Sequence, residues 1–268
     1  MRTVVHLSDL HFGRIDPAIL APLITFIGQM KPDLVAISGD LTQRARTAEF
    51  LAAKEFLAAI PFPKIVVPGN HDVPLHNIFA RFVRRLDRYR RYVTPDLQPV
   101  FTDAQIIVVG VNTARAFTWK DGRINRRQLD QLRATLENAP PGRTKIVVTH
   151  HPFDLPTGAS GRVVGRSRLA IKTLAECGVD LLLAGHFHIA DTSQTAKRYQ
   201  LPGYSAIIVS SGTSTSTRGR GQPNSLNVIR IDEPGLTIER RVWRADAGQF
   251  DVQSIEQFHR AKDGWVRE

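Results

Sequence analysis

The chain has one cysteine, Cys177, among its 268 residues. A single thiol excludes an internal disulfide framework and a cysteine-based metal cluster, so any bound metal must use His, Asp, Glu or Asn. No run reaches the roughly 18 consecutive apolar residues that a membrane-spanning helix needs. The first residues run straight into a strand-like TVVHLSD, without a basic and then apolar leader. These absences lead us to expect a soluble cytoplasmic protein with no transmembrane segment.

Aromatic residues make up only 7% of the chain, and no stripe of them is spaced for stacking on nucleic-acid bases. Basic residues are abundant, because 36 Lys and Arg face 25 Asp and Glu. The resulting net charge of +11 and the pI near 10.4 favour anionic ligands. With 42% hydrophobic residues the composition is otherwise that of a globular protein with a real core.

Short apolar runs alternate with amphipathic stretches, a pattern typical of strands buried on both faces and joined by helices. We expect helices to begin after the cap at Asp16, at the cap Thr47 and at the Asn125–Gln128 capping box, and a further helix between Ser167 and Gly178. The expected strands lie at 4–7, 34–37, 65–67, 106–111, 146–148 and 181–183.

The pattern changes after residue 204 to strands without helices, at 206–209, 226–231 and 236–242. These strands indicate a second sheet packed beside the first. Between them, residues 210–225 contain no Val or Leu and are rich in Ser, Thr and Gly, which predicts a mobile loop. We therefore expect one domain over residues 1–268, in which 204–245 complete the second sheet and 246–268 form a C-terminal extension.

Polar side chains that can bind metal follow five of the predicted strands, at the point where each strand ends. A lone Asp there is usually a turn or cap residue, and a lone strand histidine such as His6 is usually a satisfied core group. Five such places at the same edge of one sheet instead predict a site. The residues are Asp9 and His11, Asp40, Asn70, His150, and the pair His186 and His188.

The residue types fit a dinuclear metal centre. Alternate residues of an extended segment point the same way, so Asp9 and His11 can reach one ion together. Asp40 on the next strand is the natural bridging carboxylate, and Asn70 supplies a neutral oxygen. His186 and His188 can be divided between the two ions, with His150 completing the second. Two divalent ions, two aspartates, a bridging hydroxide and a singly charged phosphodiester would together be neutral, which weakly favours diesters.

These blocks resemble the pattern of the calcineurin-like metallophosphoesterase superfamily: D-x-H, GD, GNHD, H and GHxH, in that order from residue 9 to residue 188. The resemblance implies an α/β fold, a four-layer αββα sandwich of two mixed β-sheets flanked by helices. It implies two divalent or mixed-valence ions, and the oxygen and imidazole ligands suit Mn, Fe, Zn or Co. It assigns Asp9, His11, Asp40 and His188 to the first ion, and Asp40, Asn70, His150 and His186 to the second.

The same resemblance makes His71 the catalytic residue that is not a metal ligand. A leaving alkoxide needs a proton, which an imidazole can supply at neutral pH, or the ring can bind the phosphoryl oxygen. We expect Asp72 to orient this ring. The implied reaction is hydrolysis of a phosphodiester by a metal-bound hydroxide, attacking phosphorus in line with the leaving oxygen.

The blocks HLSDLH, GDLT, GNHD, HHPF and GHFH are most similar to those of bacterial class III cyclic-nucleotide phosphodiesterases, which implies a 3′,5′-cyclic nucleotide as substrate. The metal motifs are shared by nucleases, glycerophosphodiesterases and UDP-sugar lipid pyrophosphatases, so these remain alternatives. An inactive regulatory module is the alternative outside enzymes, and the intact ligand set argues against it.

Substrate contacts are less sharply marked in the sequence. Asn112 ends a strand near the site, His151 follows a ligand and is expected to line the cavity, and Arg81 opens the segment 81–92, which contains six arginines. That segment is either a solvated helix, with Phe82, Leu86 and Tyr89 on one face, or a basic lid. Arginines beside flexible glycine suit phosphate recognition at 161–168, Arg218 and Arg220.

The expected partner is a small phosphodiester. Nucleic acid is not favoured, because no appended DNA-binding motif accompanies the basic charge. A peripheral membrane contact stays open, since a basic amphipathic helix at 81–92 can lie on anionic lipid. A homodimer also stays open, because the strands after residue 204 offer a sheet edge.

Overall fold

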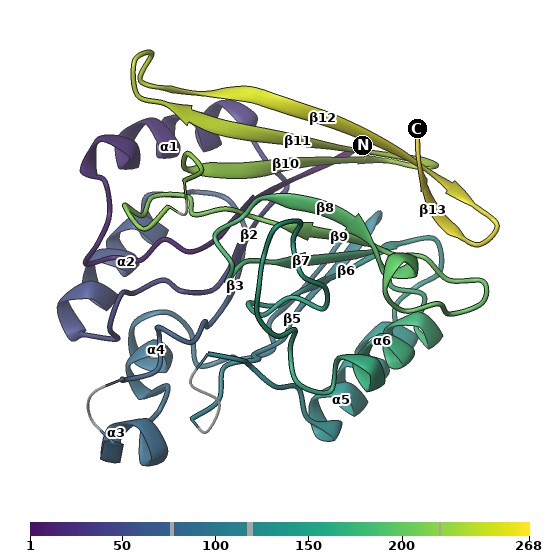
Figure 1. Cartoon of the computed structure of the whole chain (residues 1–268), viewed down its shortest axis with the longest axis horizontal. Coiled ribbons are helices and arrows are strands. Elements are labelled where there is room, and N and C mark those ends of the chain that lie inside the picture. The colour runs from purple at the N-terminus through teal and green to yellow at the C-terminus, as the bar shows by residue number, and fades with distance from the viewer. Residues whose placement is uncertain (76–77, 117–119, 220) are drawn as a thin grey trace.

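The computed structural model describes residues 1–75, 78–116, 120–219 and 221–268 (Figure 1). Its centre is a pair of mixed β-sheets. The seven-stranded sheet has the order β13-β12-β11-β10-β1-β2-β3, and the six-stranded sheet has the order β4-β5-β6-β7-β9-β8. In the first sheet β1 runs parallel to β2 and antiparallel to β10, whereas in the second β5, β6, β7 and β9 are all parallel.

The seven-stranded sheet contains β1 (Arg2–Leu7), β2 (Leu34–Ser38), β3 (Lys64–Val67), β10 (Ser225–Asp232), β11 (Gly235–Arg244), β12 (Gln249–Ala261) and β13 (Gly264–Arg267). The six-stranded sheet contains β4 (Val100–Thr102), β5 (Ile106–Gly110), β6 (Thr144–Val148), β7 (Leu181–Ala184), β8 (Asp191–Gln194) and β9 (Ile207–Ser210). All six apolar runs expected before residue 188 therefore form strands.

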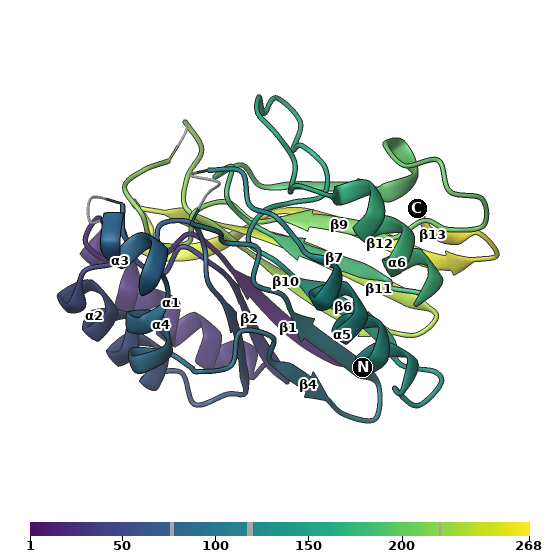
Figure 2. The same cartoon turned by 90° about the horizontal axis from the view of Figure 1, so that it is seen from below.

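The two sheets pack face to face, and helices cover their outer faces. Successive side chains of a strand point to opposite faces, so Val4 lies between the sheets, against residues such as Ile146, whereas Val5 faces the helices. The helical layer on the seven-stranded sheet is α1 (Pro17–Met30) with α2 (Thr47–Ala58). The layer on the six-stranded sheet is α5 (Arg126–Glu137) with α6 (Ser167–Glu176) (Figure 2). This confirms the four-layer αββα sandwich.

Helix starts follow the predicted caps with one exception. Asp16 caps α1 by accepting from the Ala18 N–H at 3.0 Å, and Asn125 and Gln128 form the capping box of α5. Thr47 is not a cap, because it is the first residue of α2. Glu49, in the first turn, instead reaches back to accept from the main-chain N–H groups of Arg44 and Arg46, just before the helix. The described residues also form the short helices α3 (Ile78–Val83) and α4 (Asp87–Tyr92) and the 3₁₀ helix η1 (Thr195–Lys197).

The strands after residue 204 do not form a sheet of their own. β9 extends the six-stranded sheet beside β7, while β10 pairs with β1 and begins the extension of the other sheet. Residues 246–268 supply β12 and β13, which continue that sheet to its edge. The expectation that 204–245 complete one second sheet is wrong, because the chain crosses from one sheet to the other within that stretch.

Two segments differ from their expected local structure. Residues 81–92 are not one helix, since α3 ends at Val83 and α4 begins at Asp87. Tyr89 is buried and its hydroxyl donates to the Val66 carbonyl at 2.9 Å, whereas Phe82 is 42% exposed. Residues 211–216 form no mobile loop but a buried one. In it the Thr215 hydroxyl donates to the Leu10 carbonyl at 2.7 Å, just before a predicted ligand.

Two remaining observations concern the wider fold. His6 is buried in β1 and pairs with the Ser38 hydroxyl at 2.9 Å, as expected for a core group, and burial lowers its pKa to about 3. Among the residues described here, no helix is both long enough and apolar enough to cross a membrane.

Candidate metal centre

The predicted ligands meet where strands of both sheets end. Asp9, Asp40 and Asn70 follow β1, β2 and β3 of the seven-stranded sheet, whereas His150 and His186 follow β6 and β7 of the other. The expectation that one sheet edge carries them all is wrong, since the site is built across the two sheets. Because the sheets pack face to face, a site between their strand ends is walled by two rigid layers.

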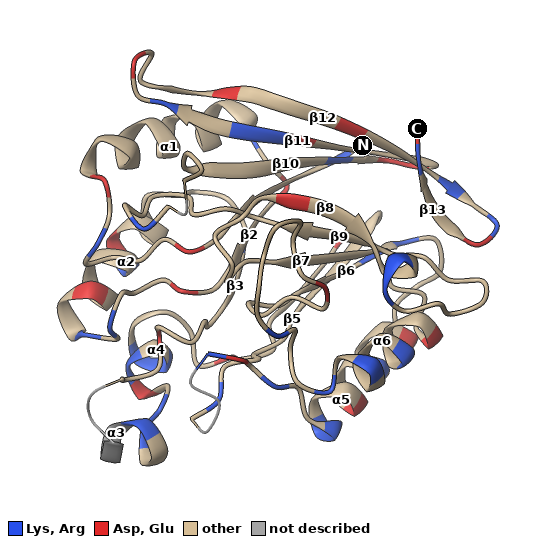
Figure 3. Ribbon diagram, in the orientation of Figure 1, with Lys and Arg blue, Asp and Glu red and all other residues tan. Residues whose placement is uncertain are grey.

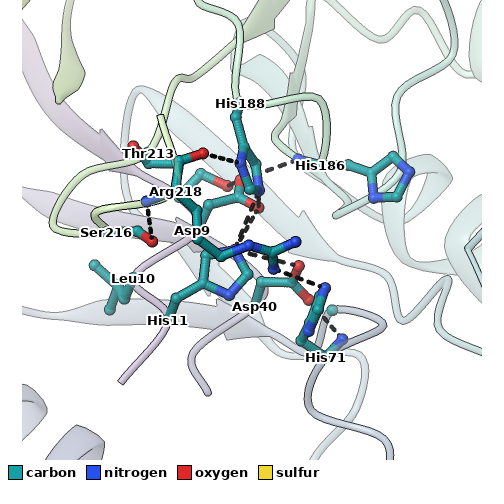
Figure 4. A network of polar contacts seen from close by, with 12 residues as sticks. Asp9, Leu10, His11, Asp40, His71, His186, His188, Thr213, Ser216 and Arg218 are labelled. Carbon is teal, nitrogen blue, oxygen red and sulfur yellow. Dashed lines mark hydrogen bonds and ion pairs between the residues drawn. The ribbon is translucent and has the colours of Figure 1, made fainter. Parts of the chain in front are cut away.

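A first cluster joins Asp9, His11, Asp40 and His188, whose ligand atoms lie within 4.8 Å of one another (Figure 4). Nε2 of His188 is 3.2 Å from Asp9 Oδ1 and 3.1 Å from His11 Nε2. His11 Nε2 is 3.6 Å from Asp9 Oδ1 and 3.8 Å from Asp40 Oδ2. All four side chains are buried. This is the ligand set expected for the first ion.

A second group of ligand atoms lies beside the first and shares Asp40 with it. Asp40 Oδ2 is 3.4 Å from His150 Nε2, and that nitrogen is 3.1 Å from Asn70 Oδ1. The His186 ring packs edge-on against the His150 ring, with centroids 5.1 Å apart. His150, His151 and His186 also bring three ring nitrogens within 4.8 Å. The carboxylate of Asp40 thus lies between the two groups of ligand atoms.

The backbone at these positions adopts a conformation that L-residues rarely take. Asp9, His11, Asp40, His186 and His188 all have φ between 51° and 77°. Positive φ in residues other than glycine is uncommon and costly, and it persists where the surroundings hold it. Here the main chain is held by hydrogen bonds such as Asp9 N–H to Gly39 O at 3.1 Å and His11 N–H to Asp40 O at 2.9 Å. The strain is concentrated on the predicted ligands, which favours a functional reason for it.

Glycines let the ligand loops approach one another. A Cβ on Gly185 would lie 1.8 Å from the Ser8 hydroxyl oxygen and 2.4 Å from Asp9 Oδ2. A Cβ on Gly69 would lie 2.1 Å from Asp40 Oδ1. Neither contact is compatible with van der Waals radii, so the GH and GN pairs of the motifs are required by packing against the two carboxylates.

In His150 and His188 a hydrogen bond of Nδ1 fixes the direction in which Nε2 points. His150 Nδ1 lies 2.8 Å from the Ser38 carbonyl oxygen, and His188 Nδ1 lies 3.1 Å from the Arg218 carbonyl oxygen. A carbonyl can only accept, so each Nδ1 donates and each Nε2 points toward the carboxylates, where its lone pair would bind a metal ion in place of a proton. These lone pairs face carboxylates, an arrangement that a cation stabilises. The donor set of imidazole nitrogens and oxygens fits Mn, Fe, Zn or Co.

The charges of the site act strongly on one another because water is excluded. Burial opposes ionisation of Asp40, but the facing imidazoles of His150, His71 and His11 lower the pKa of its carboxyl below the usual range. Burial alone would lower the pKa of His150, yet Asp40 outweighs it and raises that pKa to about 9. Burial and then the charge of His150 lower the pKa of His186 to about 3. Asp40 is therefore the electrostatic centre of both groups.

His71 stands at the open side of the first cluster, with its ring edge-on to His11 at a centroid distance of 5.0 Å. Its Nδ1 donates to the Gln43 carbonyl at 2.8 Å, and its main-chain N–H donates to Asp40 Oδ1 at 2.8 Å. Its Nε2 points away from both of these contacts and lies 3.1 Å from Arg218 Nη1, from which it can accept a hydrogen bond. A ring held in this way presents one defined nitrogen to a ligand.

Asp72 does not orient that ring, which corrects the expectation. Its carboxylate accepts from the Gly69 N–H at 2.9 Å and from the N–H groups of Leu41 and Thr42 at 3.2 and 2.9 Å. Burial and the neighbouring Asp40 charge raise its pKa to about 6. Asp72 therefore ties the loop after β3 to the loop after β2, and the Gln43 carbonyl, which no motif marks, orients His71.

Arg218 is the residue whose place the sequence indicated least well. Glycine-rich surroundings suggested a flexible phosphate contact, but the buried stretch 211–216 carries it into the centre (Figure 4). Its main-chain carbonyl holds His188 and its guanidinium reaches His71. Arg218 thus contacts one predicted ligand and the predicted catalytic histidine. Arg220, considered with it in the sequence, lies outside the described residues.

The three residues expected to contact substrate are buried and form hydrogen bonds to other groups of the protein. Arg81 is fully buried and donates to the carbonyls of Ala116 at 2.8 Å and Pro74 at 3.2 Å, so it braces loops and cannot meet a ligand directly. Asn112 is buried and accepts from the Ala114 N–H at 2.9 Å, which is the turn role. His151 is buried, and its Nδ1 pairs with the Thr113 hydroxyl at 2.8 Å. Only His151 lies against the ligands.

A family model described as calcineurin-like phosphoesterase matches residues 2–190. The match spans all five motif blocks, and the chain belongs to the calcineurin-like phosphoesterase family. The resemblance inferred from the sequence is thereby confirmed, and with it the class of the protein, a hydrolase of phosphoesters.

Several curated proteins are similar over much of their length. The chain is 24% identical over 198 residues to a glycerophosphodiester phosphodiesterase of Enterobacter lignolyticus, covering 69% of this chain and 70% of that one. It is 27% identical over 163 residues to the 3′,5′-cyclic adenosine monophosphate phosphodiesterase of Escherichia coli, covering 58% and 54%. It is 30% identical over 205 residues to a probable cyclic nucleotide phosphodiesterase of Rhodopseudomonas palustris, covering 70% and 72%.

A solved structure with the same arrangement is the purple acid phosphatase from yellow lupin seeds. It aligns with a TM-score of 0.68 over 94% of this chain and 52% of that chain, at 15% sequence identity. The likeness confirms the fold, and at this identity it carries nothing about the substrate.

Proposed function

We propose that the protein is a dinuclear-metal phosphodiesterase that hydrolyses small phosphodiesters, with 3′,5′-cyclic nucleotides as the first substrate class. The observation that carries the proposal is the position of Asp40, whose Oδ2 lies 3.8 Å from His11 Nε2 and 3.4 Å from His150 Nε2. One carboxylate between two groups of metal-binding atoms is the arrangement that two ions sharing a ligand require. If the site held a single metal ion, either His11 or His150 would not be a metal ligand.

The residues divide into three tasks in this proposal. Asp9, His11, Asp40 and His188 hold one ion, and Asp40, Asn70, His150 and His186 hold the other. Two bound ions would lower the pKa of a water molecule and stabilise the charge on the phosphoryl oxygens. For catalysis His71 would carry a proton on Nε2 as well as on Nδ1, which donates to Gln43. It would give the Nε2 proton to the leaving oxygen or hold a phosphoryl oxygen with it, once Arg218 has turned from that nitrogen to the phosphate. Arg218 donates to a phosphoryl oxygen from the open side.

The substrate class is supported by the relatives and by charge. Two of the three relatives are named as cyclic nucleotide phosphodiesterases, and the third as a glycerophosphodiester phosphodiesterase. All three names describe small phosphodiesters. The names also make a glycerophosphodiester the second candidate. Neither candidate needs a nucleic-acid groove, a membrane surface or a second copy of the chain.

The test compares three diesters on the same Mn-reconstituted protein. We expect turnover of bis(p-nitrophenyl) phosphate, which reports an intact centre, and of 3′,5′-cyclic AMP, with glycerophosphocholine as the competing natural class. Efficient hydrolysis of cyclic AMP supports the first substrate class, and hydrolysis of glycerophosphocholine in its place moves the assignment to the second. If none of the three is hydrolysed while two ions are bound, the proposed function is wrong.

Arg218→Gln is expected to weaken substrate binding without emptying the metal sites. The variant would lack the charge-assisted hydrogen bond from the guanidinium to phosphate, so KM for the diester should rise about tenfold. The contact to His188 should survive, because it is made by the main-chain carbonyl of residue 218. Steady-state kinetics with elemental analysis measures both effects. Arg244→Gln, an exposed position on β11, is the matched control, and an unchanged KM in Arg218→Gln would remove Arg218 from the substrate site.

A further inference from the structure

A cavity lies outside the metal centre, between α4, the start of α2 and the loop after β3. Its volume is 390 Å³, within the range of small-molecule sites. Four arginines line it, namely Arg84, Arg85, Arg88 and Arg91, and we call it the arginine pocket. Figure 3 shows basic residues gathered on α3, α4 and the turn between them. No predicted metal ligand lines the pocket.

The arginines of this pocket are not neutralised by the protein. Elsewhere in the chain arginines contact carboxylates, as Arg230 does with Glu239 and Arg260 with Asp180. None of the four pocket arginines forms an ion pair with a carboxylate of the described residues. Their own contacts are weaker: Arg88 Nη1 donates to the Ala45 carbonyl at 2.8 Å, and the Arg91 guanidinium lies 5.4 Å from the Tyr92 ring centre. Direct ion pairs of the described residues therefore do not cancel their charge, and only the two aspartates that line the same pocket offset part of it.

The surroundings of the pocket add to its positive field. Arg115, close to Arg85, is half-buried, and burial followed by the charges of Arg85 and Arg123 lowers its pKa to about 10. Burial is the larger cause of this lowered pKa, and the charges of Arg85 and Arg123 add to it, which places Arg115 among other cations. Neighbouring like charges repel one another, and an anion bound among them offsets that repulsion.

We propose that the arginine pocket is a binding site for a phosphomonoester dianion. Its four arginines and its two aspartates, Asp72 and Asp87, sum to two positive charges, which a dianion balances and a diester monoanion does not. One guanidinium group can donate two parallel N–H hydrogen bonds to phosphate oxygens. Four guanidinium groups therefore offer enough donors for the three terminal oxygens of a monoester. Pro74 and Tyr92 give the remaining wall apolar surface against which the organic part of an ester can pack.

The position of the pocket connects it to the centre without making it part of it. Asp72 lines the pocket and also accepts from Gly69, at the start of the loop that carries Asn70 and His71. If the proposed function holds, hydrolysis of a phosphodiester releases a monoester dianion, so the pocket would take the chemical class of the product. Binding itself does not depend on that function, since the pocket charges are present in any case.

The test is calorimetric titration of Mn-loaded protein with 5′-AMP. We expect two binding events, one at the centre and one in the pocket. The Arg84→Gln/Arg91→Gln variant should weaken one event by at least about tenfold and keep the other. Both side chains are exposed, so the thermal midpoint should be unchanged. Hydrolysis of bis(p-nitrophenyl) phosphate by this variant should also equal that of the wild type, which verifies an intact centre.

The matched control is Arg126→Gln/Arg127→Gln, which removes the same charge from exposed positions on α5. It should keep both events. Equal AMP binding by wild type and the pocket variant would overturn the proposal, as would equal weakening in both double variants, which would show only a general field. A wild-type protein that binds AMP in the pocket but hydrolyses no diester would instead contradict the proposed function alone.

A parallel titration with inorganic phosphate separates two sources of the dianion. If phosphate binds the pocket as tightly as AMP, the site recognises the dianion alone and free phosphate is its ligand. If AMP binds at least tenfold more tightly, the ester group contributes through the apolar wall and a monoester is the ligand. Both results require loss of binding in Arg84→Gln/Arg91→Gln.

Discussion

Asp40→Ala is expected to abolish hydrolysis and to release both metal ions together. The carboxylate lies between the two groups of ligands, 3.8 Å from His11 Nε2 and 3.4 Å from His150 Nε2. Its removal would take one ligand from each ion and leave the second ion with neutral donors only, since Asn70, His150 and His186 carry no negative charge. Activity on bis(p-nitrophenyl) phosphate should fall by about a thousandfold or more.

Elemental analysis of the same preparation distinguishes this explanation from a simple catalytic defect. We expect the metal content of Asp40→Ala to fall from two ions per chain toward zero, whereas loss of a ligand to one ion alone would leave one. Asp130→Ala, an exposed change of the same kind on α5, should keep both ions and full activity. An Asp40→Ala protein with two ions and wild-type turnover would show that the centre is not dinuclear in the way proposed.

The five ligand blocks could be located from the sequence because their chemistry is local. Each block follows a buried apolar run, and the residue types are those that hard and borderline cations accept. That the blocks come from two sheets could not be seen. Strand assignment to a sheet depends on pairing, and the pairing of β1 with β10 joins residues more than 220 positions apart. The sequence of parallel strands such as β5, β6 and β7 has the same apolar pattern whichever sheet the strands belong to.

Residues 211–216 show why composition gave a wrong prediction of exposure, whereas the hydrophobic pattern predicted the strands correctly. A stretch of Ser, Thr and Gly without large apolar side chains predicts a loop in solvent. In the structure its hydroxyl and main-chain groups replace apolar packing: the Ser214 N–H donates to the Ser8 carbonyl at 2.9 Å, and Ser214 Oγ accepts from the Ser8 N–H at 3.1 Å. Small polar residues allow this close approach to the end of β1. Only the fold reveals that the stretch delivers Arg218 to His71.

The arginine-rich segment after the GNHD block was ambiguous for a physical reason. Six arginines in twelve residues fit a solvated helix or a basic lid equally well, because charge alone does not say which side chains are covered. The structure divides them: Arg81 is buried as a brace, while Arg84, Arg85, Arg88 and Arg91 line a pocket. Burial of a single arginine against carbonyl oxygens has no sequence signature of its own.

His71→Ala is expected to keep both ions and to lose turnover. His71 belongs to neither group of ligand atoms, and its main-chain N–H, which donates to Asp40 Oδ1 at 2.8 Å, is retained in the variant. The lost imidazole is the group that the proposal assigns to the leaving oxygen or to a phosphoryl oxygen, so kcat should fall by about a hundredfold to ten-thousandfold. Metal content measured with kcat separates this result from that of Asp40→Ala.

Two substrates with different leaving groups distinguish the two roles proposed for His71, proton donor or ligand of a phosphoryl oxygen. A p-nitrophenolate leaves as a stable anion and needs no proton, whereas the ribose oxygen of a cyclic nucleotide leaves as an alkoxide and does need one. If His71 supplies that proton, the variant should lose far more activity on cyclic AMP than on bis(p-nitrophenyl) phosphate. If His71 only binds a phosphoryl oxygen, both substrates should lose activity equally, and His71→Gln, which can still donate a hydrogen bond, should restore part of it. Full activity of His71→Ala on both substrates would remove His71 from the reaction, and the pairing of Arg218 with it would then be structural.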